Sequence, residues 1–314
     1  MTSEGAERPQ ATVVGNALVD VIVTRQGQFP RLGGAGLNVA VLLAQGGLKT
    51  SLVTSLADDL PGRAIRLLAS RLGIQLIESG RVSATPQATV HLDADKPSYE
   101  FDLPAYLPFD FSPAVQLSAS TADLVVVNAF DYSGLSQVDS LRHLLDSCGG
   151  WRVVDPNVRP GLLRDIGAAA HGLRRLLPAI DILKVSDEDV EHLGGAVSQA
   201  GEDFLTKGVK VLFLTRGARG AMLYTVAGTP LQAAAQVLPV QVVDTVGAGD
   251  AALAALLVGA VCERPGLVRS RGSLGQLAWG SHLDRAMAAA ALACQQRGGP
   301  AGPVPEDEAL SPAR

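Results

Sequence analysis

The chain has 314 residues, 47% of them hydrophobic, and a formal net charge of −5. That length suffices for one large domain, the acidic balance argues against a general nucleic-acid binder, and no apolar run is long enough to span a membrane. The polar N-terminus also lacks the features of a secretory signal, so we expect a cytoplasmic protein without nucleic-acid or membrane partners.

Short, nearly continuous apolar runs rich in β-branched residues recur along the chain and predict buried strands. They lie at 11–15, 50–57, 122–129, 151–157, 181–186 and 210–217. Helical patterns lie between several of these runs, at 37–47, 61–73 and 136–150. Strands that alternate with helices are typical of an α/β fold with a doubly wound, mostly parallel sheet flanked by helices.

Residues 85–105 break this alternation of strands and helices. Their polar and apolar positions alternate around a DADKP turn signal, which predicts a hairpin with strands at 88–92 and 98–102. These strands are too polar for a central sheet, so they form either a small lid over a ligand cleft or a surface excursion. The two ends, residues 1–10 and 301–314, are predicted to be flexible tails.

The stretch DTVGAGDA at 244–251 combines a strand end, a turn of small residues and the start of an Ala/Leu-rich helix. Backbone N–H groups at a helix start have no internal partner and lie at the positive end of the helix dipole. The small residues Gly247, Ala248 and Gly249 would let an anion reach them, as in phosphate sites. Asp250 could then accept a proton from a hydroxyl that attacks phosphorus, and an Asp that only caps the helix is the structural alternative.

The signature D-T-x-G-A-G-D resembles the C-terminal motif of the ribokinase-like (PfkB) carbohydrate kinases. Other segments agree with that family in order: GNALVD at 15–20, LGGAGLNVAVLLAQGG at 32–47, DPNVRP at 155–160, LKVSDEDVEHLGG at 183–195 and LTRGARGAMLY at 214–224. The resemblance covers about residues 11–300. It implies a ribokinase-like kinase domain whose small β-sheet lid comprises about 85–105 plus strands near 11–35. Two of the segments, DPNVRP and LKVSDEDVEHLGG, favour the fructokinase and 2-keto-3-deoxygluconate kinase branch.

The resemblance also implies where the chemistry takes place. Asp250 would be the general base, and the N–H groups of Gly247, Ala248 and Gly249 would form an anion hole for the transferred phosphoryl group. The residues expected to bind the substrate are Asp20, Gly33, Gly34, Asn38 and Arg159. Asp and Asn side chains suit vicinal hydroxyls. Arg159 would pair with phosphate oxygens or an acidic substrate, unless it forms an ordinary surface ion pair.

The same resemblance implies a nucleotide site and two cation sites. The residues expected at the nucleotide are Asn157, Ser186, Thr215 and Gly217. Asp189 would organise Mg²⁺ through water, although the family usually has Glu at this position, and Asp244 would help to order a monovalent cation such as K⁺. Lids in this family often pair between subunits, so a homodimer through the lid is a further expectation.

We therefore predict an ATP-dependent sugar kinase that phosphorylates a primary hydroxyl of a sugar or sugar acid. Two alternatives stay open: a nucleoside (adenosine-like) kinase of the same fold, and a catalytically weak sugar-binding regulatory protein. The regulatory alternative is suggested by two departures from the family pattern, the glycine-free SLADD at 55–59 and Ala252, where Phe is common. An NAD-binding oxidoreductase ranks last, because the chain has no GxGxxG after its first strand.

Overall fold

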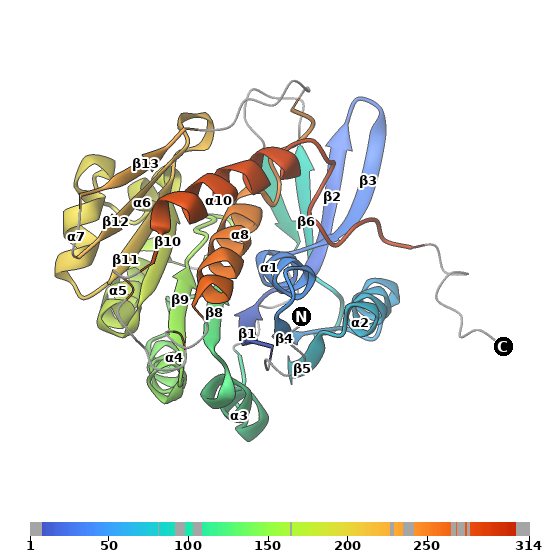
Figure 1. Cartoon of the computed structure of the whole chain (residues 1–314). Helices are drawn as coiled ribbons and strands as arrows, with labels where there is room; N and C mark the ends of the chain where they lie inside the picture. The colour runs from blue at the N-terminus through green and yellow to red at the C-terminus, as the bar shows by residue number, and fades with distance from the viewer. Residues whose placement is uncertain are drawn as a thin grey trace, which may run out of the picture.

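The apolar runs pair as neighbouring strands of one nine-stranded sheet, in the order β13-β12-β11-β10-β9-β8-β1-β4-β5 (Figure 1). The computed structural model describes residues 8–80, 82–91, 98–102, 109–163, 165–226, 229–234, 242–264, 268, 274 and 277–305. The strands are β1 (Gln10–Gly15), β4 (Lys49–Ser55), β5 (Gln75–Gly80), β8 (Leu124–Asn128), β9 (Trp151–Asp155), β10 (Ile182–Ser186), β11 (Val211–Thr215), β12 (Ala221–Thr225) and β13 (Leu231–Ala233). Among these described strands, the pairs β11–β12 and β12–β13 are antiparallel and the other six pairs are parallel, so the predicted mostly parallel sheet is confirmed.

Helices cover both faces of this sheet, as in a doubly wound fold (Figure 1). One face carries α1 (Ala35–Gln45), α2 (Leu60–Leu72), α8 (Ala248–Glu263) and α10 (Trp279–Ala293). The other carries α3 (Pro113–Thr121), α4 (Leu135–Ser147), α5 (Ile166–Leu176), α6 (Asp187–His192) and α7 (Ala200–Thr206). Short 3₁₀ turns lie at Leu177–Ala179, Val197–Gln199 and Gly217–Arg219. None of the described helices combines the length and hydrophobicity of a membrane-spanning segment.

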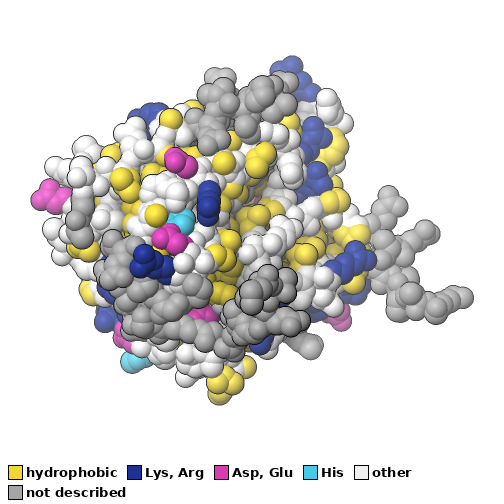
Figure 2. Space-filling model, in the orientation of Figure 1, with side chains coloured by type: hydrophobic (Ala, Val, Ile, Leu, Met, Phe, Trp, Pro, Cys, Tyr) yellow, Lys and Arg dark blue, Asp and Glu magenta, His cyan; other side chains and the backbone are white. Residues whose placement is uncertain are grey.

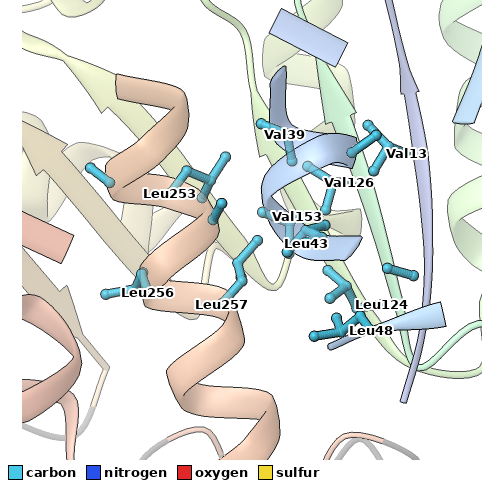
Figure 3. Close-up of a cluster of buried hydrophobic side chains, with 14 of the residues drawn as sticks. Val13, Val39, Leu43, Leu48, Leu124, Val126, Val153, Leu253, Leu256 and Leu257 are labelled. Carbon is cyan, nitrogen blue, oxygen red and sulfur yellow. The ribbon is translucent and has the colours of Figure 1, made fainter. Parts of the chain in front are cut away.

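Each parallel strand contributes side chains to both helical layers, because successive residues of a strand point to opposite faces. Val126 of β8 packs on the side of α1 and α8, in the cluster that holds Val39 and Leu253 (Figure 3). Val125 and Val127 of the same strand are equally buried on the opposite side. This two-sided burial explains why the strands are continuous apolar runs in the sequence.

Hydrophobic side chains also line a groove of about 610 Å³ between α1, α8 and α10 (Figure 2).

A second sheet of four strands, in the order β3-β2-β6-β7, lies beside the main sheet (Figure 1). Its strands are β2 (Leu18–Thr24), β3 (Gly27–Gly33), β6 (Gln87–His91) and β7 (Ser98–Asp102). The predicted hairpin is therefore β6 paired with β7, and it joins β2 and β3 in one small sheet. The run at 11–15 lies in the main sheet instead, because β1 is apolar on both faces. Residues 92–97 and 103–105 of the predicted lid insertion lie outside the described residues.

Asp59, from the glycine-free SLADD segment, links the small sheet to the main domain. Its carboxylate caps α2 by accepting the N–H of Gly62 at 2.9 Å. The same carboxylate accepts the N–H of Thr85 at 2.7 Å and the Thr85 hydroxyl at 2.6 Å. Thr85 lies just before β6, so these bonds fix the start of the lid strand against the helix. The departure from the family pattern at SLADD thus retains a defined structural role.

The C-terminal segment packs against the outer edge of β3. The N–H of Leu32 donates to the carbonyl of Gly302 at 2.9 Å, and the N–H of Val304 donates to the carbonyl of Pro30 at 3.3 Å. Residues 301–305 are therefore part of the packed structure and not of a flexible tail, because they pair with backbone groups that an edge strand would otherwise leave open. Residues 1–7 and 306–314 lie outside the described residues.

Candidate active site

The carboxyl ends of the central strands meet at one edge of the main sheet, which is the usual ligand position in open α/β sheets. Register places Asn128 of β8 opposite Asp155 of β9, and Ser186 of β10 opposite Thr215 of β11. Two cavities lie at this edge, and the turn at 247–250 that begins α8 contributes to the walls of both. The sequence motif thus lies where the two cavities adjoin.

The smaller cavity, about 80 Å³, lies between the lid and this turn. Four of the predicted substrate residues line it, namely Asp20, Gly34, Asn38 and Arg159, together with Gly247 and Asp250. The lid contributes Ala88 of β6 and Phe101 of β7. The fifth predicted residue, Gly33, lies against Asp20, and a Cβ at this position would overlap the Asp20 carboxylate. Gly33 therefore leaves space for the Asp20 side chain.

The larger cavity, about 590 Å³, lies on the other side of the turn. It is lined by all of the predicted nucleotide residues, Asn157, Ser186, Thr215 and Gly217, and by Asp189, Ala248 and Gly249. Helix α10 adds an apolar wall of Met287, Ala290 and Ala291, and Cys294 follows directly after the helix. Asn157 and Arg159 line both cavities, so the two cavities adjoin there as well.

The turn itself depends on a left-handed residue at the start of α8. Gly247 has a φ of 77°, a conformation that glycine adopts without the steric penalty of a side chain. The N–H of Ala248 donates to the carbonyl of Thr245 at 3.2 Å. Because Ala248 already has this acceptor, the N–H groups of Gly247 and Gly249 are the better candidates for binding an anion.

Asp250 is held between two buried amide side chains. Asn38 Nδ2 donates to Asp250 Oδ2 at 2.9 Å, and Asn128 Nδ2 approaches Asp250 Oδ1 at 3.4 Å. Burial raises the pKa of the Asp250 carboxyl, and the bond from Asn38 and the charge of Lys184 oppose this rise. The Oδ1 atoms of both asparagines are buried and accept no hydrogen bond from the described residues. Of the two asparagines, Asn38 lines the smaller cavity.

Asp20 is a second buried carboxyl at the smaller cavity. Burial, and then the charges of Asp250 and Asp244, raise its pKa to about 7, and a hydrogen bond from the backbone of Gly34 opposes them. Because the pKa in the folded state is above that of the unfolded chain, the protonated form of Asp20 stabilises the fold. This contribution is fully present below the unfolded pKa, near 4, and is lost as pH rises through about 7.

We expect the variant Asp20→Asn to have a higher melting temperature than the wild type at pH 8, where the wild type holds a buried charge. The difference should narrow as the pH falls from 8 to 5, because the wild-type carboxyl becomes protonated. Thermal unfolding of both proteins across this range measures the effect. The exposed Asp284→Asn serves as control and should show no such trend. A difference that is constant or grows toward pH 5 contradicts the assignment.

Asp189 and Asp244 both bind backbone N–H groups through their two oxygens. Asp189 accepts from Val158 and from Ser186, each at 2.7 Å, and forms a capping box with Ser186 at the start of α6. Asp244 accepts from Val246 and from Gly298, each at 2.8 Å. Both carboxylates therefore fix loops beside the cavities.

Sequence reasoning assigned no role to three buried polar residues of this region: Asn128, Asp155 and Lys184. Lys184 Nζ lies 3.0 Å from Asp155 Oδ2, and both side chains are almost fully buried. Each residue interrupts or ends an otherwise apolar strand, which is a signal visible in the sequence. The partner of each could not be inferred from it, because the contacts join different elements, 29 residues apart for Lys184 and Asp155 and 122 apart for Asn128 and Asp250.

Comparison with known proteins identifies the family. Residues 11–307 match the profile of the pfkB family carbohydrate kinases. The chain belongs to this family. It is therefore a carbohydrate kinase, a phosphotransferase that acts on a sugar hydroxyl, and the resemblance drawn from the sequence is confirmed.

Relatives of this kinase include a fructokinase of Rhizobium leguminosarum bv. trifolii, which is 31% identical over 258 residues covering 75% of each chain. A solved structure of a Vibrio cholerae O395 fructokinase double mutant, with fructose, ADP and potassium ion bound, is 21% identical with a TM-score of 0.75 and covers 98% of both chains. A fructokinase from Xylella fastidiosa with bound ATP is 22% identical with a TM-score of 0.73, covering 92% of this chain and 93% of that one. These structures support the ribokinase-like fold.

Proposed function

We propose that this kinase transfers the γ-phosphoryl group of ATP to a primary hydroxyl of a neutral sugar, with a ketohexose such as fructose as the preferred acceptor. The observation that carries the proposal is the position of Asp250, whose carboxyl lines the smaller cavity one residue after Gly249, which lines the larger one. A base at this boundary can deprotonate an acceptor in one cavity for attack on a donor in the other.

The reaction follows from these positions. The sugar binds in the smaller cavity, and Asp250 takes the proton of its primary hydroxyl. The hydroxyl oxygen bonds to the γ-phosphorus while the bond from that phosphorus to the bridging oxygen of ADP breaks. The backbone N–H groups of Gly247 and Gly249 and the guanidinium of Arg159 face the charge that spreads over the transferred group. Asn38 keeps the base oriented throughout, through its bond to Oδ2.

A neutral sugar suits the lining of the smaller cavity better than a sugar acid. Asp20 and Asp250 supply carboxyl oxygens that suit hydroxyl donors, and they outnumber Arg159, the one cationic side chain among the described residues that line this cavity. The small volume favours a single sugar ring over a nucleoside, which carries a base as well. The fructokinase relatives point to the same substrate class.

Mg²⁺ fits the larger cavity as a companion of the nucleotide. The described residues contain no cluster of three or more side chains that could bind a metal ion by themselves. Asp187, Glu188 and Asp189 line the cavity, where they can contact the water shell of Mg²⁺ bound to ATP phosphates. The ion would neutralise phosphate charge during transfer. A K⁺ ion beside Asp244, a homodimer through the lid and a cytoplasmic location are further proposals based on the family resemblance.

A panel of acceptors tests the proposal. With Mg·ATP, ADP release should be fastest for fructose among fructose, glucose, ribose, 2-keto-3-deoxygluconate and adenosine, because the smaller cavity offers acceptors to a neutral polyol. The measurement is kcat/KM for each compound by a coupled ADP assay. Preferred turnover of adenosine would support the nucleoside kinase alternative. Absence of ADP release with every acceptor, while ATP and fructose still bind, would support the regulatory alternative.

A further inference from the structure

Lys184 lies in the middle of β10, inside the main sheet, and its side chain is only 6% exposed. Its Nζ atom pairs with the fully buried carboxylate of Asp155 on the neighbouring strand, at 3.0 Å from Oδ2 and 3.3 Å from Oδ1. Burying two charges carries a large desolvation cost, and apolar residues of similar size often serve a sheet interior equally well. The pair therefore calls for an explanation other than stability.

The position of the ammonium group supplies one. Lys184 lines the larger cavity together with Ala248 and Gly249. A Cβ built on Gly249 would lie 3.3 Å from Lys184 Nζ, so the ammonium group is next to the backbone of the turn that begins α8. The Nζ atom of Lys184, which extends from β10, therefore lies next to the turn whose N–H groups would bind an anion.

The surroundings keep this lysine charged. Burial alone would lower the pKa of Lys184, but the carboxylates of Asp155, Asp189 and Asp250 outweigh burial and raise it. The same ammonium charge opposes the rise in pKa of the Asp250 carboxyl. Lys184 is therefore a buried cation that acts electrostatically on Asp250 and lines the larger cavity.

We propose that Lys184 is a catalytic residue that donates hydrogen bonds to the phosphoryl group during transfer, and that Asp155 positions it. This inference rests on the proposed kinase reaction. Lys184 gives up no proton: the hydroxyl proton goes to Asp250, and the leaving group is ADP. The ammonium group instead stabilises charge on the transferred oxygens, beside the N–H groups of Gly247 and Gly249.

Lys184→Met tests the proposal, with the double variant Lys184→Met/Asp155→Asn as its partner. We expect the single variant to lose kcat by at least about 100-fold, the effect of removing one preorganised donor. KM for the sugar should change little, because Lys184 does not line the sugar cavity. The single variant also leaves Asp155 buried without its cation, so its melting temperature should fall. The double variant removes that charge and should recover the melting temperature without recovering kcat.

The double variant separates catalysis from folding. If the double variant regains both thermal stability and kcat, the pair is only structural and the proposal is wrong. Asp155→Asn alone keeps the ammonium group of Lys184 but removes the carboxylate that positions it. This variant should lower kcat by about tenfold and leave the sugar KM unchanged. Lys210→Met is the control, because Lys210 pairs with the buried Asp181 at 2.7 Å, and these two residues lie just before β11 and β10, at the opposite end of the main sheet from the cavities. It should leave kcat unchanged.

A binding measurement keeps this inference distinct from the choice of substrate. Calorimetry with the β,γ-imido analogue of ATP needs no sugar turnover. Lys184→Met should weaken binding of this analogue by at least about tenfold and leave the binding of adenosine unchanged, since the lysine faces phosphate and not the base. Equal affinities for the analogue in wild type and variant would overturn the proposal. A wild type that binds the analogue but phosphorylates no sugar would contradict only the proposed function.

Discussion

Replacing Asp250 with Asn should leave the fold intact and lower kcat by at least about 1,000-fold, within the range that a general base contributes. The amide cannot accept the hydroxyl proton, so the attacking oxygen loses its activation. The fold should survive, because an Asn at 250 can still accept from Asn38 Nδ2, and a flip of the Asn128 amide would turn its Oδ1, in place of Nδ2, toward the new amide N–H. Turnover with fructose and Mg·ATP, together with thermal unfolding, measures both effects.

Two comparisons make the test of Asp250 specific. Asp165→Asn changes another aspartate at a helix start, because Asp165 caps α5 by accepting from the N–H of Ala168 at 3.0 Å. It should keep wild-type kcat, since α5 does not line either cavity. Above neutral pH Asp250→Asn should also be at least as stable as wild type, because burial raises the pKa of the Asp250 carboxyl and its ionised form costs stability. A variant that turns over within tenfold of wild type would show that another group is the base.

The main sheet and the turn were predictable because their signals are local. A strand buried on both faces must be apolar at every position, and the runs at 11–15, 122–129 and 181–186 correspond to β1, β8 and β10. The small residues at 247–249 likewise indicate that a ligand can approach the backbone closely. Each such signal fits within a few consecutive residues, so one sequence is enough to read it.

The partners of the buried polar groups were not predictable, because they depend on register. Asn38 and Asp250 are 212 residues apart, and Asn128 and Asp250 are 122 apart. A polar residue at the end of an apolar run indicates a functional site, but the run does not predict which residue forms a hydrogen bond with it. The same holds for Gly302 and Val304, whose backbone pairing with β3 turns an expected tail into packed structure.

Asp189 has a structural role that its sequence motif did not predict. The sequence predicted it as a contact for Mg²⁺ through water, and it does line the larger cavity. Its shorter side chain, compared with the usual Glu, places both oxygens on backbone N–H groups of Val158 and Ser186. The helix cap and the loop after β9 are thereby held together, so any action on Mg²⁺ would come in addition to this anchoring.

Replacing Asp244 with Ala should reduce both stability and turnover. Its carboxylate joins the start of the turn at Val246 to Gly298 in the C-terminal segment, and both N–H donors would lose their acceptor inside the protein. Each such loss costs about 1–3 kcal/mol, so the free energy of unfolding should fall by roughly 2–6 kcal/mol. A shift of the turn by about 1 Å would misplace Asp250 and the N–H groups of Gly247 and Gly249, and such a displacement can lower kcat about 100-fold.

The control for Asp244 is another buried aspartate that accepts a backbone N–H group far from the cavities. Asp123 accepts from Gln10 at 2.7 Å at the opposite end of the main sheet. Asp123→Ala should lose stability and keep kcat below its melting temperature, whereas Asp244→Ala should lose kcat even where it is fully folded. Activity with KCl and with choline chloride adds a further distinction, because a cation site at Asp244 predicts that K⁺ activates the wild type but not the variant. If both variants keep wild-type kcat when folded, the turn does not depend on Asp244, and its order must come from the glycine conformation and α8 alone.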